Sequence, residues 1–229
     1  MRPGINRKGL WVWVISIASI LGPPSSGPAT ADDVDAALYI PAPPADSAFV
    51  RFARGTREQE ESAPRIDGRR LAPVPFGEAG DYVVVAGGGH RIRFAGHDET
   101  VVFAPGGFYT LAVACNACPG GLLVLTDESD LDRAKALLSL YNLGDAASVS
   151  LETVEGSLPV IQAITPGAAG SRIVNAIRVS LAATAGDLRI ESFPAVVLER
   201  GSAYSVLVTG VEGHYSARLV RNRSDLSTR

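Results

Sequence analysis

Cysteine, histidine and methionine are scarce in this 229-residue chain, which has two, three and one of them, and aromatic residues make up only 7%. A structural zinc site needs four ligands. The small number of cysteines and histidines therefore disfavours a metal centre. Long apolar segments are also missing. The apolar run Leu10 to Leu21 has 12 residues, whereas a membrane-spanning helix needs about 20. A permanent membrane anchor is therefore disfavoured.

Catalytic signatures are missing as well. No Gly-x-Ser-x-Gly elbow marks a serine nucleophile, and the three histidines lie in separate turn-rich segments. The Gly-Asp-Ser block of one large esterase class is incomplete, because no serine follows Gly80-Asp81, Gly144-Asp145 or Gly186-Asp187. Paired carboxylates for glycoside chemistry depend on spatial rather than sequence spacing, and nothing singles out a pair. We expect no catalytic residue, no metal and no cofactor.

The first residues have the order of a secretory signal. Three basic residues precede the run Leu10 to Leu21, and a Gly/Pro/Ser stretch leads from it to Ala29-Thr30-Ala31. A charged, then apolar, then small-residue order is typical of signal peptides. We expect cleavage after Ala31. No cysteine follows until Cys115, which argues against a lipid-modified N-terminal cysteine, and we expect a soluble exported protein.

Export changes the charge of the chain. Losing Arg2, Arg7 and Lys8 leaves 18 of 21 basic residues against 24 acidic ones, a net charge of −6. A nucleic-acid binder would show a basic stripe with interleaved aromatic residues, and none is present. A uronic-acid polymer would meet the same repulsion apart from local patches. The candidates for such patches are Arg51, Arg91 and Arg93, at outward positions of two expected strands, where arginines usually face solvent.

What the chain has in plenty is turn residues between short apolar runs. The 24 glycines and 15 prolines punctuate segments rich in β-branched and aromatic residues, which is typical of an all-β protein. The expected strands are residues 48–54, 82–85, 90–94, 100–103, 108–115 and 121–125, then 136–142, 148–153, 176–181, 188–191, 195–198, 204–209 and 215–220, with weaker ones at 38–40 and 70–74. Gly87 to Gly89 is expected to be a hairpin turn rather than a phosphate loop, since a strand and not a helix follows it.

Two segments occur twice in the same order. Residues 48–54 resemble 136–142, and residues 107–113 resemble 201–208. The alternative is chance similarity between β-rich strings, but an ordered pair of echoes favours tandem related domains. We therefore predict two tandem antiparallel β-sandwich domains of the immunoglobulin-like kind, at 32–130 and 131–229, after a signal peptide at 1–31. The loops are expected at 55–68 and 163–172, and the polar tail from 221 is expected to fray.

Cys115 and Cys118 leave four interpretations open. In an exported protein a lone pair is more often oxidised than free, so we favour a local disulfide at the end of a hairpin. A thioredoxin-like redox pair would need a helix after the first cysteine, and a zinc site would need histidines to complete it. An unpaired dithiol is the remaining alternative.

Three blocks resemble the AlgF family of alginate O-acetylation proteins of Gram-negative bacteria. They are residues 37–39 with 46–52, residues 135–143, and residues 196–201 with 206–210. Cys115 and Cys118 are outside the family pattern, and residues 55–80 and 155–172 show no clear match. The resemblance implies a periplasmic accessory protein without a nucleophile of its own, which acts as an adaptor for acetyltransferase partners that carry serine-esterase-like motifs.

Our expectation is therefore a non-catalytic periplasmic adaptor of an exopolysaccharide O-acetylation machinery, and the family resemblance implies that the polymer is alginate. The partner surface is expected around Tyr39, Phe49 and Arg51. Weak binding to the anionic polysaccharide is allowed, and binding to nucleic acid is not. The alternative is a carbohydrate-binding module with Tyr82 and Tyr109 as aromatic platforms, although tyrosines that alternate with core positions are more often packed.

Overall fold

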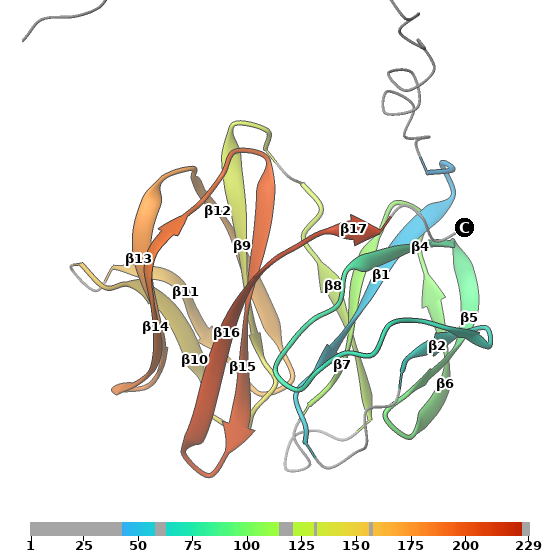
Figure 1. Cartoon of the computed structure of the whole chain (residues 1–229), viewed down its shortest axis with the longest axis horizontal. Helices are drawn as coiled ribbons and strands as arrows, with labels where there is room; N and C mark the ends of the chain where they lie inside the picture. Colours follow the sequence, from blue (N-terminus) through green and yellow to red (C-terminus); the bar gives the residue numbers. More distant parts are fainter. Residues whose placement is uncertain (1–42, 58–62, 115–120, 131, 156–157, 226–229) are drawn as a thin grey trace, which may run out of the picture. The chain divides into compact units, whose positions relative to one another are not determined.

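A computed structural model describes residues 43–57, 63–114, 121–130, 132–155 and 158–225, which form strands, turns and loops (Figure 1). These residues belong to one compact unit, Pro41–Arg229. The expected signal peptide, Tyr39, Cys115 and Cys118 lie outside the described residues. Within the described part, no helix has the length and apolar character needed to cross a membrane.

The first half of the chain builds two facing sheets. Its strands are β1 (Ser47–Arg54), β2 (Arg65–Ile66), β3 (Arg69–Arg70), β4 (Tyr82–Ala86), β5 (Gly88–Phe94), β6 (His97–Phe103), β7 (Phe108–Val113) and β8 (Leu122–Asp127). One sheet has the order β17-β4-β1-β7-β8, in which β17 (Ser224–Asp225) comes from the C-terminal end of the chain, and the other has the order β3-β2-β5-β6. Val50 and Phe52 of β1 share a buried apolar core with Ile92, Phe94 and other residues of the second sheet.

The second half repeats this plan. Its strands are β9 (Lys135–Asn142), β10 (Val149–Thr153), β11 (Pro159–Ile164), β12 (Ala169–Asn175), β13 (Arg178–Ala185), β14 (Leu188–Val197), β15 (Ser202–Val211) and β16 (His214–Arg221). The sheets are β11-β10-β13-β14 and β12-β9-β15-β16, and they enclose a separate core that includes Leu138, Leu151 and Val206. The prediction of an all-β protein with two tandem sandwiches is confirmed.

The two repeated segments occupy equivalent places in the two halves. β1 pairs in parallel with β7, and β9 pairs in parallel with β15. The sheets are therefore mixed rather than purely antiparallel, because each sandwich joins its first and penultimate long strands in parallel.

Gly87 to Gly89 do not form a hairpin, which corrects the sequence-based expectation. β4 pairs with β1, whereas β5 pairs with β2 and β6, so this segment carries the chain from one sheet to the other. A Cβ on Gly87 would lie 2.9 Å from the carbonyl oxygen of Asp46, and Gly88 has a φ of 122°. Glycine is needed here for close approach and for its backbone conformation.

Three further expectations are corrected. The loop expected at 163–172 contains the end of β11 and the start of β12, and the strands expected at 188–191 and 195–198 are one strand, β14, in which Ala195 has a φ of 51°. The tail does not simply fray. Its strand β17 (Ser224–Asp225) pairs with Tyr82 and Val83 of β4 in the first sandwich, and Figure 1 shows it reaching across to that strand.

Candidate functional site

Arg51 is buried, with 1% of its surface exposed, so the expectation that it faces solvent is wrong. Side chains alternate along a strand, and Val50 and Phe52 fill the core while Arg51 and Ala53 point to the other face. That face is covered by the second sandwich, where Ala53 packs in a cluster with Tyr141, Leu143 and Leu207. Alternation was read correctly, but solvent does not lie on the outer side.

Four acceptors surround the Arg51 guanidinium. Its Nε donates to Thr110 Oγ1 of β7 at 2.8 Å, and Nη1 donates to Asn222 Oδ1 at 2.8 Å. Nη2 donates to Tyr141 OH of β9 and to Ser205 Oγ of β15, both at 2.9 Å. Three of these four partners come from the second half of the chain, so one arginine links the two sandwiches.

Asp127, at the end of β8, completes the charge balance. Its side chain is 4% exposed, and Oδ2 lies 4.0 Å from Arg51 Nε. Tyr82 OH and Thr110 Oγ1 donate to Oδ2 at 2.7 and 2.5 Å, and Tyr141 OH donates to Oδ1 at 2.5 Å. Three hydroxyl donors on one carboxyl group fit the ionised form, which only accepts hydrogen bonds.

We call this set the interface network: Arg51, Tyr82, Thr110, Asp127, Tyr141, Ser205 and Asn222. Burial raises the pKa of Tyr82 and Tyr141 well above the usual value for tyrosine; the nearby charge of Arg51 opposes this shift, whereas Asp127 adds to it. Burial opposes the charge of Arg51, but the oxygen atoms of Tyr141, Tyr82 and Asp127 outweigh it and raise its pKa. Both tyrosines are therefore neutral donors and Arg51 is a cation at neutral pH.

The sequence echoes place the polar residues of this network. Arg51 lies opposite Thr110 in the β1–β7 pair, and Ser139 lies opposite Ser205 at the matching place in the β9–β15 pair. Each half therefore has one pair of facing polar residues in the middle of its parallel strand pair. In the sequence, β1 and β9 each contain an apolar run with a single polar residue in its middle. This pattern was the signal that could have revealed a strand covered on both faces.

Aromatic rings connect Phe49 to the network. Phe49 is half-buried and stacks on Phe108 with ring centroids 4.3 Å apart, and Phe108 meets Tyr82 edge to face at 5.3 Å. The Arg51 guanidinium lies 4.5 Å from the Tyr82 ring centroid. Phe49, predicted to start a partner surface, is thus packed against the interior on one side and accessible on the other.

Tyr82 and Tyr109, the candidate sugar platforms, are 5% and 9% exposed. The packed alternative is therefore correct for both. Tyr109 OH accepts a hydrogen bond from the Ala104 amide at 3.0 Å, and Tyr204 OH accepts one from the Glu199 amide at 3.1 Å. Both bonds span five residues, which is the pattern of the tyrosine corner of immunoglobulin-like sandwiches.

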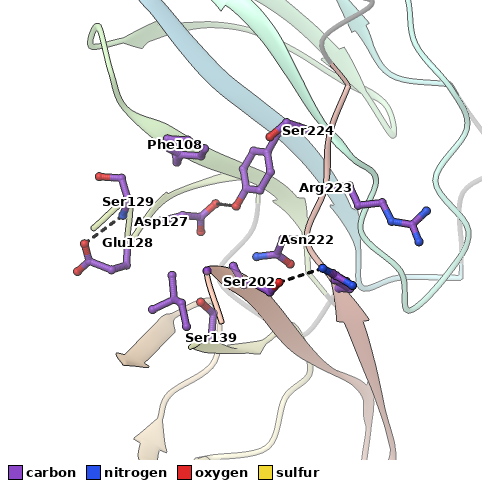
Figure 2. Close-up of a pocket in the computed structure, with 14 residues that line it drawn as sticks. Phe108, Asp127, Glu128, Ser129, Ser139, Ser202, Asn222, Arg223 and Ser224 are labelled. Atoms are coloured by element: carbon purple, nitrogen blue, oxygen red, sulfur yellow. Dashed lines mark hydrogen bonds between the residues drawn. The ribbon is translucent and has the colours of Figure 1, made fainter. Parts of the chain in front are cut away.

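A cavity of about 320 Å³ borders the network. Its lining comes from β4, β7, β8, β9, β15, the end of β16 and the segment that leads to β17, and it includes Phe108, Glu128, Ser202, Arg221 and Ser224. In this lining Tyr82 OH donates to Asp127 Oδ2 at 2.7 Å, and Figure 2 shows the side chain of Arg223 extending away from Asp127. Both carboxylate oxygens of Asp127 and the Oδ1 atom of Asn222 are already hydrogen-bonded to protein groups.

The other candidate residues lie apart from this site. Arg91 and Arg93 are 62% and 53% exposed, as expected, and both bind Asp98. His90 places Nδ1 2.7 Å from Asp67 Oδ2 and Nε2 2.9 Å from the Ala86 carbonyl oxygen. The remaining histidines are found as follows: His97 has Nδ1 3.7 Å from Glu99 Oε1, and His214 is exposed. Among the described residues, no group of three or more histidine, cysteine or acidic side chains is arranged to hold a metal.

Comparison with known proteins gives consistent matches. A family model described as "Alginate O-acetyl transferase AlgF" matches residues 24–205. The chain is 30% identical over 176 residues to the alginate biosynthesis protein AlgF of Pseudomonas putida, which covers 77% of this chain and 79% of that protein. It is 31% identical over 176 residues to the protein of the same name from Pseudomonas fluorescens, with 77% and 78% covered.

One solved structure also matches. It is the C-terminal domain of AlgF from P. aeruginosa, with 28% sequence identity and a TM-score of 0.36, and the match covers 39% of this chain and 99% of that one.

Proposed function

This chain belongs to the AlgF family of alginate biosynthesis proteins, and from that premise we propose that it is a non-catalytic adaptor of a polysaccharide O-acetylation machinery. In this proposal the chain is exported to the periplasm and binds the proteins that transfer acetyl groups. Those partners carry the nucleophile, and the polymer is alginate or a closely related uronate.

The observation that supports the proposal is that the polar atoms of the interface network bind one another. Three buried side chains could in principle take part in catalysis, namely Arg51, Asp127 and Tyr141. Their polar atoms are already paired with one another and with neighbouring hydroxyl groups. Their arrangement supports a structural role, in which the network holds two sandwiches as one rigid body. A rigid body loses less conformational entropy on binding than a jointed one, which favours an adaptor that must present surfaces to more than one partner.

Binding measurements test this proposal. The chain from Asp32 onward is immobilised, and the purified periplasmic acetylation proteins of the same gene neighbourhood are titrated by biolayer interferometry. We expect saturable binding to at least one of them and no turnover of an acetyl ester by the purified chain. Ester turnover that follows the chain through independent purifications would contradict the non-catalytic part.

The carbohydrate-binding alternative has its own readout. Bare and acetylated polyuronate are titrated against the isolated chain under the same conditions. Saturable polymer binding without any protein partner would favour that alternative over the adaptor.

A further inference from the structure

The sheet β3-β2-β5-β6 of the first sandwich has an outer face rich in arginine. Ile66 of β2 and Ile92 of β5 point into the core. Because side chains alternate along a strand, their immediate neighbours on these two strands point outward. The register then places seven outward residues together, which we call the arginine face: Arg65, Arg70, Arg91, Arg93, Asp98, Thr100 and Val102.

Three arginines of this face lie in one row across the sheet. Arg70 is opposite Arg65, and Arg65 is opposite Arg93. Like charges directly opposite each other on neighbouring strands destabilise a sheet. Folding alone therefore gives no reason for this arrangement, and a ligand that brings negative charge would relieve it.

The carboxylate within the face is already occupied. Asp98 accepts from Arg91 Nε and Nη2 at 2.7 and 2.9 Å, and from Arg93 Nε at 2.7 Å. These bonds lower the pKa of Asp98 to about 2, and the bonds from Arg91 make the largest contribution. Asp98 therefore stays ionised and paired with these two arginines. The Arg65 side chain donates to the Gly68 carbonyl oxygen at 3.1 Å, while the side chain of Arg70 has no hydrogen bond or ion pair with any residue that the structure describes.

An exposed apolar side chain lies on the same face. Val102 is 72% exposed, more than any other large hydrophobic residue in the described ranges. Val102 lies opposite Gly89, two residues along the strands from the Arg91–Thr100 pair. Because glycine has no side chain, the residue directly opposite does not cover Val102. Arginine is enriched at protein interfaces and among the residues that carry most of the binding energy, and burying the exposed Val102 side chain against a partner would add apolar contact.

We propose that the arginine face docks an acidic segment of a protein partner, whose carboxylates bind Arg65 and Arg70 and whose apolar side chain covers Val102. This inference rests on the proposed adaptor function. A folded partner brings its carboxylates to this face alone, whereas a long polyanion would also meet the net negative charge of the rest of the chain. Guanidinium groups pair with carboxylates in two parallel hydrogen bonds, which also gives the contact a defined geometry.

Charge reversal tests the docking face. The chain from Asp32 onward is prepared with Arg65→Glu and Arg70→Glu, and a control carries Arg178→Glu and Arg200→Glu, two exposed arginines of the second sandwich. Both doubles change the net charge equally. We expect the first double to weaken binding to one purified acetylation protein by at least about tenfold and the control to change it by less than about twofold. Val102→Ser, which adds no charge, is expected to weaken the same binding by about threefold or more.

The outcomes separate this proposal from the adaptor function. If the wild-type chain binds its partner and the reversal leaves the affinity unchanged in chains with unaltered circular dichroism, the arginine face is wrong and the adaptor stands. A wild-type chain that binds no acetylation protein overturns both proposals. If the reversal instead abolishes saturable binding to bare polyuronate, the face serves a polymer and the assignment to a protein partner fails.

Discussion

Arg51 is held inside the protein by hydrogen bonds that compensate for its lost hydration. A buried charge is costly unless it is paired and fully hydrogen-bonded, and here Asp127 supplies the opposite charge while Thr110, Tyr141 and Ser205 accept from the guanidinium. Removing one member of such a set leaves the others buried without partners. The stability of the chain should therefore depend strongly on this residue.

Replacing Arg51 with alanine is expected to lower the free energy of unfolding by about 3–5 kcal/mol, because the Asp127 carboxylate then stays buried without a cation. Urea denaturation followed by circular dichroism measures the change. The control is Arg189→Ala, which removes an exposed ion pair to Glu152 of 3.9 Å and should cost less than about 1 kcal/mol. Equal effects for the two variants would contradict the role of Arg51.

Tyr82 and Tyr141 make the fold sensitive to alkaline pH. Their pKa values are raised in the folded state, so above pH of about 10 the unfolded chain releases protons that the folded chain keeps. Stability is therefore complete below that pH and falls as the pH rises, by up to about 1.4 kcal/mol per pH unit for each tyrosine. Urea denaturation at a series of pH values measures the slope.

Tyr82→Phe serves as the control for this dependence, since it removes the hydroxyl group of one of these two buried tyrosines. Its alkaline slope should be shallower than that of the wild-type chain. A free energy of unfolding that stays constant through the alkaline range would show that these hydroxyls ionise in the folded protein.

β7 and β15 begin with the same tyrosine hydrogen bond at equivalent positions. Each begins beside a tyrosine whose hydroxyl returns to the backbone five residues earlier, Tyr109 to Ala104 and Tyr204 to Glu199. Tyr204 OH also donates to the Val197 carbonyl oxygen at 3.1 Å. The repeated corner fixes the start of the strand that pairs in parallel with β1 or β9.

We expect Tyr204→Phe to destabilise the chain more than Tyr109→Phe does. The first variant leaves both an amide and a carbonyl group without their partner, at about 2 kcal/mol, and the second leaves one amide, at about 1 kcal/mol. Thermal or urea unfolding of the two variants compares them directly. The reverse order would show that the two corners are not equivalent elements.

β12 and β17 show which elements local sequence cannot reveal. Gly170 looked like a loop residue, yet a Cβ there would lie 2.6 Å from Ile164 Cδ1, so the glycine allows close packing within a strand. β17 is two polar residues long, and its place depends on β4, where the Tyr82 amide donates to the Arg223 carbonyl oxygen at 2.8 Å. No nearby residue pattern carries that information.

The described chain is expected to unfold as one cooperative body. The apolar interface cluster around Ala53 and Leu207 and the interface network both join residues from the two halves, so one sandwich cannot open without exposing groups of the other. Differential scanning calorimetry of the chain from Asp32 onward should show one transition, with calorimetric and van 't Hoff enthalpies that agree.

The double variant Ser205→Ala with Asn222→Ala tests the coupling. It removes two acceptors that the second half offers to Arg51, so the first sandwich should melt at a lower temperature and the single transition should broaden or split. Two separate transitions in the wild-type chain would contradict the coupling at once.

Alternation, turn residues and repetition were enough to predict the all-β class, the two sandwiches and the equivalence of β1 with β9, because these properties follow from local chemistry that recurs along the chain. The positions of Arg91 and Arg93 were predicted for the same reason, since nothing covers their face among the described residues. The interface network was not predicted. Whether the outer face of β1 meets water or a second sandwich depends on residues about 90 to 170 positions away, and only the folded chain brings Arg51 to Tyr141, Ser205 and Asn222.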